Sequence, residues 1–286
     1  MCSGCTGLEG TGGRGTSLAT CAPSVAVLMC HAPIVIPTIG RSRADQCLAS
    51  TQAMTEAARI VVEHGIRTLI LISPHTPRFA HAYGGIFSPT LRGSFSSFGF
   101  PDLGCTFTQD PEVLDALNHH AKRHRFELQP VEMDGVDHGA LVPLWFLQAA
   151  GYKGSVSILG LPWECPSGTH ARFGAALSEA LSELSPWALV ASGDMSHALK
   201  SGSPAGFDPQ AQEFDEGVVA CVREDRLQDL AAIDPPLRDR AAEDVVDSLE
   251  VARGAMNGDT QGHRFLSYEG PFGVGYLVAV LREAGD

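Results

Sequence analysis

Short, continuously apolar runs alternate with longer segments of helical periodicity from Ser24 onward. A run without polar positions is typical of a strand that is buried on both faces of a parallel sheet. The predicted strands are Val25 to Met29, Thr68 to Ile72, Val156 to Leu159 and Ala188 to Ala191. Alternation of such strands with helices predicts an α/β fold, with a central and largely parallel sheet flanked by helices on both faces.

Longer segments between these strands carry the helical pattern. The predicted helices are Arg43 to Glu63, Pro111 to Arg123, His170 to Leu184, Pro209 to Arg223 and Arg238 to Met256. Gly65 follows the first helix as a stop signal, and Asp110 before Pro111 provides an N-cap for the second. Residues 84–104 are rich in Gly, Ser, Phe and Pro, and irregular segments of this length often belong to a binding site or a lid.

The domain organisation follows from where periodicity begins. Residues 1–22 are rich in Gly, Ser and Thr and lack periodicity, so we expect a flexible leader there. Residues 23–286 contain no repeat or linker and are predicted to form one domain. The eight cysteines are scattered, and the first twenty residues hold no apolar signal segment. We therefore expect reduced thiols and a cytoplasmic location.

Composition narrows the class of protein further. Of 286 residues 44% are hydrophobic, which excludes disorder of the whole chain. The 20 Lys and Arg residues against 33 Asp and Glu residues give a net charge of −13, which argues against a nucleic-acid partner. No window approaches the roughly 18 consecutive apolar residues of a membrane helix, so a membrane partner is not expected.

Histidines follow three of the predicted strands directly. His31, His75 and His197 lie where the first, second and fourth strands end, and His138 lies in a turn before an apolar helical segment. In an open α/β sheet, ligands bind outside the carboxyl ends of the strands, so these four side chains are expected to converge. The remaining histidines except His81 fit surface or helix-end positions; they are His64, His119, His120, His124, His170 and His263.

Converging histidines with one carboxylate suit a transition metal. Two imidazoles and a carboxylate on one face of an octahedron leave open positions for a substrate and O₂, whereas Zn²⁺ accepts the same donors in a hydrolase. The candidate carboxylates are Glu243, Glu269, Asp194 and Glu164. Spacing alone leaves the choice among them open.

Several segments together carry a family resemblance. They are His31-Ala32-Pro33, Ser73-Pro74-His75, Asp137-His138-Gly139, Ser192-Gly193-Asp194-Met195-Ser196-His197 and Tyr268-Glu269-Gly270-Pro271-Phe272-Gly273-Val274-Gly275-Tyr276. In this order they resemble the catalytic, B-type subunit of the class III extradiol ring-cleavage dioxygenases, the LigB-like superfamily. The resemblance covers residues 24–284, and the Ser-Gly-Asp-Met-Ser-His segment is its most specific part.

The resemblance implies a mononuclear, non-haem Fe(II) centre held by two histidines and a glutamate. Carried onto this chain, the metal ligands are His31 and His75, with Glu243 preferred to Glu269 because Glu243 precedes an Arg-Gly-Ala-Met segment as in the family. His197 corresponds to the acid/base catalyst. The implied reaction inserts O₂ into a catecholic aromatic substrate and opens its ring.

Two further residues are expected beside this centre. His138 is expected to hydrogen bond to a substrate hydroxyl or to reduced oxygen, and Asp194 either fixes the tautomer of His197 or caps a helix. Members of the family often work with a small accessory subunit, so a homo-oligomer or such a partner is expected. The alternative is a Memo-like or zinc-dependent protein of the same fold without ring cleavage, acting as a hydrolase or as a metal-binding interaction protein.

Overall fold

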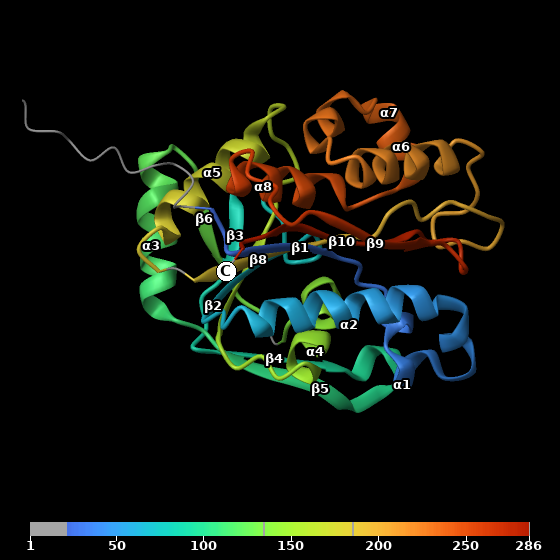
Figure 1. Cartoon of the computed structure of the whole chain (residues 1–286), viewed down its shortest axis with the longest axis horizontal. Coiled ribbons are helices and arrows are strands. Elements are labelled where there is room, and N and C mark those ends of the chain that lie inside the picture. The colour runs from blue at the N-terminus through green and yellow to red at the C-terminus, as the bar shows by residue number, and fades with distance from the viewer. Residues whose placement is uncertain (1–21, 134, 185, 286) are drawn as a thin grey trace, which may run out of the picture.

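A central eight-stranded sheet organises the chain (Figure 1). The computed structural model describes residues 22–133, 135–184 and 186–285. The strand order is β6-β3-β7-β2-β8-β1-β10-β9, and the four strands β7, β2, β8 and β1 are parallel to their neighbours within this group. Strands β10 and β9 extend the sheet antiparallel to β1. A separate hairpin is formed by β4 and β5. The expected leader, residues 1–22, lies outside the described residues except for Ala22.

The strands of these two sheets have the following bounds: β1 Val25–Met29, β2 Thr68–Ser73, β3 Tyr83–Ile86, β4 Thr90–Phe95, β5 Phe100–Thr108, β6 Leu128–Val131, β7 Ser155–Gly160, β8 Trp187–Ser192, β9 Arg264–Glu269 and β10 Tyr276–Glu283. Each of the four predicted strands is therefore present, extended by at most one or two residues. The segment expected to be irregular, residues 84–104, contributes to β3 and to the β4–β5 hairpin instead.

Helices cover both faces of the sheet. Their bounds are α1 Pro37–Gly40, α2 Leu48–Glu63, α3 Pro111–Arg123, α4 His138–Ala149, α5 Thr169–Leu181, α6 Ala211–Arg223, α7 Pro235–Ala241 and α8 Val246–Met256, with shorter 3₁₀ turns η2 Pro33–Val35, η3 Arg41–Cys47, η4 Ser96–Phe98 and η5 Leu227–Ala232. Figure 1 shows α2 and α4 on one side of the sheet and α5, α6 and α8 on the other. None of the helices in the described part of the chain is both long and apolar enough to span a bilayer.

Alternate residues of the buried strands supply two hydrophobic cores. In β1, Val25, Val27 and Met29 belong to the core beneath α2 and α4, whereas Ala26 and Leu28 belong to the core beneath α5 and α8. All five side chains are fully buried. Burial on both faces explains why these strands are apolar without interruption, as the sequence pattern predicted.

The local signals of the first two predicted helices, the stop at Gly65 and the N-cap at Asp110, are confirmed. Helix α3 begins at Pro111, and the Asp110 carboxylate accepts a hydrogen bond of 3.0 Å from the N–H of Glu112. This bond satisfies one of the free N–H groups that every helix start leaves. Gly65 follows α2 with a φ of 60°, a left-handed conformation that glycine adopts without strain.

The prediction of one helix from Arg238 to Met256 is wrong. Helix α7 ends at Ala241, because Ala242 adopts a left-handed conformation with φ 51° and ψ 45°, and α8 begins only at Val246. The Glu243 carboxylate accepts hydrogen bonds from the N–H groups of Val245 and Val246, at 2.7 and 2.9 Å, and so caps α8. This break turns residues 242–245 into a loop at the carboxyl edge of the sheet.

Candidate metal centre

Three potential ligand atoms from distant segments meet at the carboxyl edge of the sheet. His31 follows β1, His75 follows β2, and Asp244 lies in the loop between α7 and α8. The two Nε2 atoms are 3.0 Å apart, and Asp244 Oδ2 lies 3.4 Å from Nε2 of His31 and 3.2 Å from Nε2 of His75. Donor atoms about 2.1 Å from a metal ion lie about 3.0 Å apart at octahedral angles and about 3.4 Å apart at tetrahedral angles. The spacing of these three atoms therefore fits one divalent metal ion.

The tautomer of His31 is fixed by Ser192, the last residue of β8. The Ser192 hydroxyl donates a 2.5 Å hydrogen bond to the Gly139 carbonyl, so its own proton is already used. Its oxygen then accepts from Nδ1–H of His31, at 3.0 Å. Because Nδ1 carries the proton, the lone pair of the neutral ring lies on Nε2 and points at the other two ligand atoms.

Asp194 connects two of the ligand segments. Its carboxylate accepts a 2.8 Å hydrogen bond from the main-chain N–H of His31, and its own N–H donates to Asp244 Oδ1 at 2.7 Å. The Asp194 side chain is buried. Neither expected role, fixing the ring of His197 or capping a helix, describes these contacts, because Asp194 holds a histidine and a carboxylate of the candidate metal centre in place.

The electrostatics of the centre favour a cation between these groups. Burial opposes charging of His31, but the carboxylates of Asp194 and Asp244 outweigh it and raise the pKa of His31 to about 9. Burial raises the pKa of Asp194, whereas for Asp244 the attraction of His31 and His75 overcomes burial and lowers the pKa. The metal-free centre therefore holds a proton, which a metal ion displaces on binding.

His138 is brought to the centre by the cap of helix α4. The Asp137 carboxylate accepts hydrogen bonds from Ser73 (2.6 Å), Thr76 (2.8 Å) and the N–H of Ala140 (3.1 Å), which ties the end of β2 to the start of α4. The His138 ring, at the first position of α4, has its centroid 4.1 Å from that of His75. Asp137 thus caps helix α4 and places His138 at its first position.

The charge state of His138 follows from its neighbours. Burial and the positive charges of His75 and His31 lower the pKa of His138 to about 4. The ring is therefore neutral near pH 7 and has both a donor and an acceptor nitrogen. His31, His75 and His138 together have potential ligand atoms within 4.8 Å of one another.

Glu243, the glutamate expected as a ligand, does not join the histidines. Its side chain is 2% exposed and hydrogen bonds to Arg238 Nε at 2.5 Å, in addition to capping α8. Two neighbouring residues in a turn point in different directions, and here Asp244 rather than Glu243 faces His31 and His75. Asp244 is not among the carboxylates predicted from the sequence, because residues 238–256 carry the pattern of one continuous helix and the family resemblance implies a glutamate.

The other candidate carboxylates have other partners. Glu269 Oε1 accepts a 2.7 Å hydrogen bond from the N–H of Ser50 at the start of α2. Glu164 is exposed in the segment after β7. Asp244 is thus the carboxylate that the structure brings within 3.5 Å of both Nε2 atoms.

His197 lies in the loop after β8, near the centre but outside the group of three rings. Its N–H donates to the Ala241 carbonyl at 2.8 Å, which anchors this loop to the end of α7. Its charge lowers the pKa values of Asp194 and Asp215, against the larger opposite effect of burial. Nδ1 is buried and has no hydrogen-bond partner in the described part of the chain.

Comparison with known protein families assigns the chain to one of them. Residues 25–279 match the family of the catalytic LigB subunit of aromatic ring-opening dioxygenase. The chain belongs to this LigB family. The match includes all of the segments that hold the candidate centre, from His31 after β1 to the loop before α8. It also includes β9 and the first half of β10.

Individual relatives extend this comparison. The chain is 28% identical over 265 residues to Protein CA_C1420 of Clostridium acetobutylicum, an alignment that covers 89% of this chain and 56% of that protein. The chain thus spans about half the length of this curated relative. Among solved structures, uncharacterized protein JW3007 from Escherichia coli K12 shares the fold, with a TM-score of 0.59 and 17% identity over 90% of this chain and 98% of that one.

A cavity of about 600 Å³ lies near the candidate metal centre, although none of His31, His75, His138 and Asp244 lines it. Ala32, directly after His31, lines it, and so does Phe98, whose ring centroid lies 5.7 Å from that of His138. We call it the aromatic pocket, after its side chains Phe98, Phe100, Phe272 and Tyr276. Burial, with a contribution from Asp194, raises the pKa of Tyr276, so its phenol stays protonated beside the centre.

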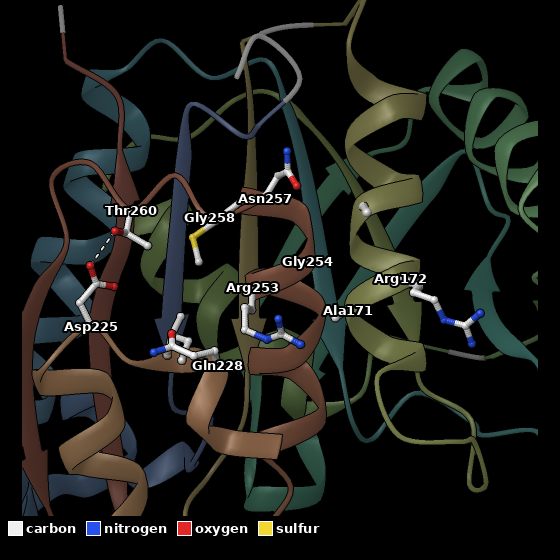
Figure 2. A pocket seen from close by; sticks show the side chains of 12 residues that line it. Ala171, Arg172, Asp225, Gln228, Arg253, Gly254, Asn257, Gly258 and Thr260 are labelled. Carbon is white, nitrogen blue, oxygen red and sulfur yellow. Dashed lines mark hydrogen bonds between the residues drawn. The ribbon is translucent and has the colours of Figure 1, made fainter. Parts of the chain in front are cut away.

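A second hollow, of about 430 Å³, lies between α5, η5 and the end of α8. Figure 2 shows Arg172, Gln228 and Arg253 around it, with Thr260 donating a 2.6 Å hydrogen bond to Asp225. Its lining residues include none of the His31, His75, His138 and Asp244 group. This hollow is therefore separate from the candidate metal centre.

Proposed function

We propose that the protein is an Fe(II)-dependent extradiol dioxygenase that cleaves the ring of a catecholic substrate, with His31, His75 and Asp244 as its metal ligands. The observation that carries this proposal is the triangle of two imidazole nitrogens and one carboxylate oxygen with edges of 3.0, 3.4 and 3.2 Å. Two histidines and a carboxylate on one face are typical of non-haem Fe(II) oxygenases. Membership in the LigB family supports the same assignment.

The chain's own residues prepare this site before any ligand binds. The iron would supply a Lewis-acid and redox centre with positions for the catechol hydroxyls and O₂. Ser192 and Asp194 hold His31 and Asp244 in their orientations, so little reorganisation accompanies metal binding. The Asp137 cap holds the end of β2 and the start of α4, and with them His75 and His138.

Proton transfer falls to the two histidines that are not assigned as ligands. A catechol must lose protons when it binds as a chelate, and a neutral imidazole accepts one near neutral pH. We assign His197 as this acid/base group, because it lies in the loop after β8 and corresponds to the acid/base histidine that the family resemblance implies. His138 is assigned as a hydrogen-bond partner of the substrate, because burial and neighbouring charge lower its pKa and keep it neutral.

The aromatic pocket gives the substrate an apolar environment beside the centre. Phe98 extends from the η4 turn towards His138, and Phe100 begins β5. Flat aromatic side chains favour a planar ring and exclude water from its faces. Exclusion of water protects the reactive oxygen chemistry from side reactions.

The test is anaerobic loading of the purified protein with Fe(II), followed by exposure to a panel of catechols in the presence of O₂. We expect stoichiometric O₂ uptake and a yellow ring-opened product. An Asp244→Asn variant should bind less iron and turn over little, whereas Glu269→Gln should behave as wild type. Hydrolytic activity of the Zn²⁺-loaded protein, without O₂ uptake on any catechol by the Fe(II) form, would instead support the zinc hydrolase alternative.

A further inference from the structure

A second cluster of side chains with metal-binding atoms lies between helices α3 and α5. His120 is in the last turn of α3, His124 is the C-cap of the same helix, and Glu179 lies in the second half of α5. One potential ligand atom from each of the three residues lies within 4.8 Å of the other two. The cluster shares no residue with the candidate metal centre.

Helical geometry places the two histidines of this cluster on one face. They are four residues apart, and the N–H of His124 donates to the carbonyl of His120 at 3.0 Å, so the helical spacing continues to the C-cap. Residues at positions i and i+4 are neighbours on a helix surface. The two rings are accordingly almost parallel, with an interplanar angle of 16° and centroids 6.4 Å apart. Two imidazoles at this spacing are a known pair of Zn²⁺ ligands on one helix.

The carboxylate of the cluster comes from the neighbouring helix. Glu179 Oε2 lies 2.9 Å from Nε2 of His124, although the two residues are 55 positions apart in the chain. Phe126, just after α3, packs edge-on against the buried Phe173 of α5, with ring centroids 5.4 Å apart. Figure 1 shows the two helices side by side. Packing of apolar side chains therefore holds the two parts of the cluster together before any ion binds.

Burial and exposure differ among the three side chains. Nδ1 of His120 is buried and has no hydrogen-bond partner among the described residues. A buried polar atom without a partner is uncommon in proteins, and a bound ion or water is a usual explanation. The side chains of His124 and Glu179 are 31% and 42% exposed, so an ion can reach the cluster directly from solvent.

We propose that His120, His124 and Glu179 bind one Zn²⁺ ion that links α3 to α5. Two imidazoles and a carboxylate suit Zn²⁺, whereas Mg²⁺ and Ca²⁺ prefer oxygen ligands. Tetrahedral Zn²⁺ holds its donor atoms about 3.4 Å apart, so rotation of these side chains brings the ligand atoms into place. Water completes the fourth position. The ion replaces a single contact between His124 and Glu179 with a link among three side chains.

Calorimetric titration of the metal-free protein with Zn²⁺ tests the proposal. The wild-type protein should bind one equivalent more than His124→Gln and one more than Glu179→Gln. This difference holds whether or not the candidate metal centre itself takes up Zn²⁺. Lys122 and Arg123 lie between the two histidines and carry positive charge, so the affinity should be in the micromolar range. His119→Gln is the matched control and should bind as wild type, because His119 is exposed on the same helix and outside the cluster.

Hydrogen exchange shows whether the ion links the two helices. At a Zn²⁺ concentration of about 100 times the dissociation constant, amide exchange in α3 and α5 of the wild-type protein should slow about 10- to 100-fold. The double variant His120→Gln, His124→Gln should show no such slowing. Circular dichroism of this variant in EDTA should match wild type, because the contact that it loses is partly exposed and contributes little to stability.

Two results would overturn the proposal. One is a double variant that binds as many equivalents of Zn²⁺ as the wild-type protein. The other is an extra equivalent in the wild-type protein that leaves exchange in both helices unchanged, because such an ion would not link them.

Discussion

Asp194 donates its main-chain N–H to Oδ1 of Asp244 at 2.7 Å, while its carboxylate accepts the N–H of His31 at 2.8 Å. One residue thus fixes the positions of two ligands that lie more than two hundred residues apart in the chain. Loss of its carboxylate should weaken metal binding without removing a ligand. We expect Asp194→Ala to raise the metal dissociation constant about 10- to 100-fold, the usual effect of a residue that supports a ligand.

Calorimetric titration with Fe(II) under nitrogen measures this effect. Glu213→Ala is the control, because Glu213 is exposed on α6. An unchanged metal affinity in Asp194→Ala would show that His31 and Asp244 keep their positions without this link.

The neighbouring acids Glu243 and Asp244 should respond to substitution in opposite ways. Asp244→Asn is expected to lose most of its metal content and to fold normally. Glu243→Gln should keep its metal and lose stability, because it breaks a buried pair with Arg238. Breaking a fully buried pair costs about 3–5 kcal/mol, and the cost here should be smaller because the Arg238 side chain is 28% exposed.

Metal analysis by mass spectrometry and urea unfolding of both variants provide the comparison. If Glu243→Gln lost its metal while Asp244→Asn retained it, the ligand would be the glutamate that the family resemblance implied.

Removal of the Ser192 hydroxyl should free the ring of His31. Without an acceptor for Nδ1–H, the ring can take the tautomer or the orientation in which Nε2 no longer offers its lone pair. We expect Ser192→Ala to weaken metal binding about tenfold or more. Ser248→Ala is a close control, since the Ser248 hydroxyl is buried in α8 without a partner in the described residues and should not affect metal binding.

The two non-ligand histidines should separate metal binding from proton transfer. His197→Phe is expected to retain iron and to lose turnover by about 10²- to 10⁴-fold, the contribution of a positioned acid/base group. His138→Ala should retain iron and show a smaller loss, because it removes a hydrogen bond to substrate. Iron content and single-turnover O₂ kinetics are measured on the same samples.

Either of two results would change the assignment of His197. Full activity of the phenylalanine variant removes the acid/base role, and loss of iron makes His197 a ligand.

Asp215 should make the free energy of unfolding depend on pH. Burial raises the pKa of Asp215 to about 6, even though its carboxylate accepts hydrogen bonds from Tyr268 and from the N–H of Ser196. The folded state therefore keeps this proton between about pH 4 and pH 6, where the unfolded state releases it. The free energy of unfolding should fall as pH rises through this window, by about 3 kcal/mol in total.

Urea unfolding at pH values from 4 to 7 measures this contribution. The Asp215→Asn variant should show a flatter dependence than wild type, and Asp239→Asn, at an exposed site on α7, should not. If Asp215→Asn and the wild-type protein showed the same dependence of stability on pH, the assignment of the raised pKa to Asp215 would be wrong.

The sequence by itself determined the parallel core and the convergence of histidines on its carboxyl edge. Continuous apolar runs are a local property, and the residue that follows such a run lies at the end of a buried strand whatever the rest of the chain does. The ends of β1 and β2 are adjacent to β8 on its two sides, and this is why His31 and His75 meet there.

Only the tertiary structure decided which carboxylate faces those histidines. The helical pattern of residues 238–256 continues through the point where the chain breaks, and nothing local signals a left-handed Ala242. The break is held by the buried contact of Glu243 with Arg238 and by the hydrogen bonds between Asp244 and Asp194, fifty residues away. A one-residue shift at such a turn exchanges a capping glutamate for a ligand aspartate, because the contacts with Arg238 and with the distant Asp194 set the direction of each side chain.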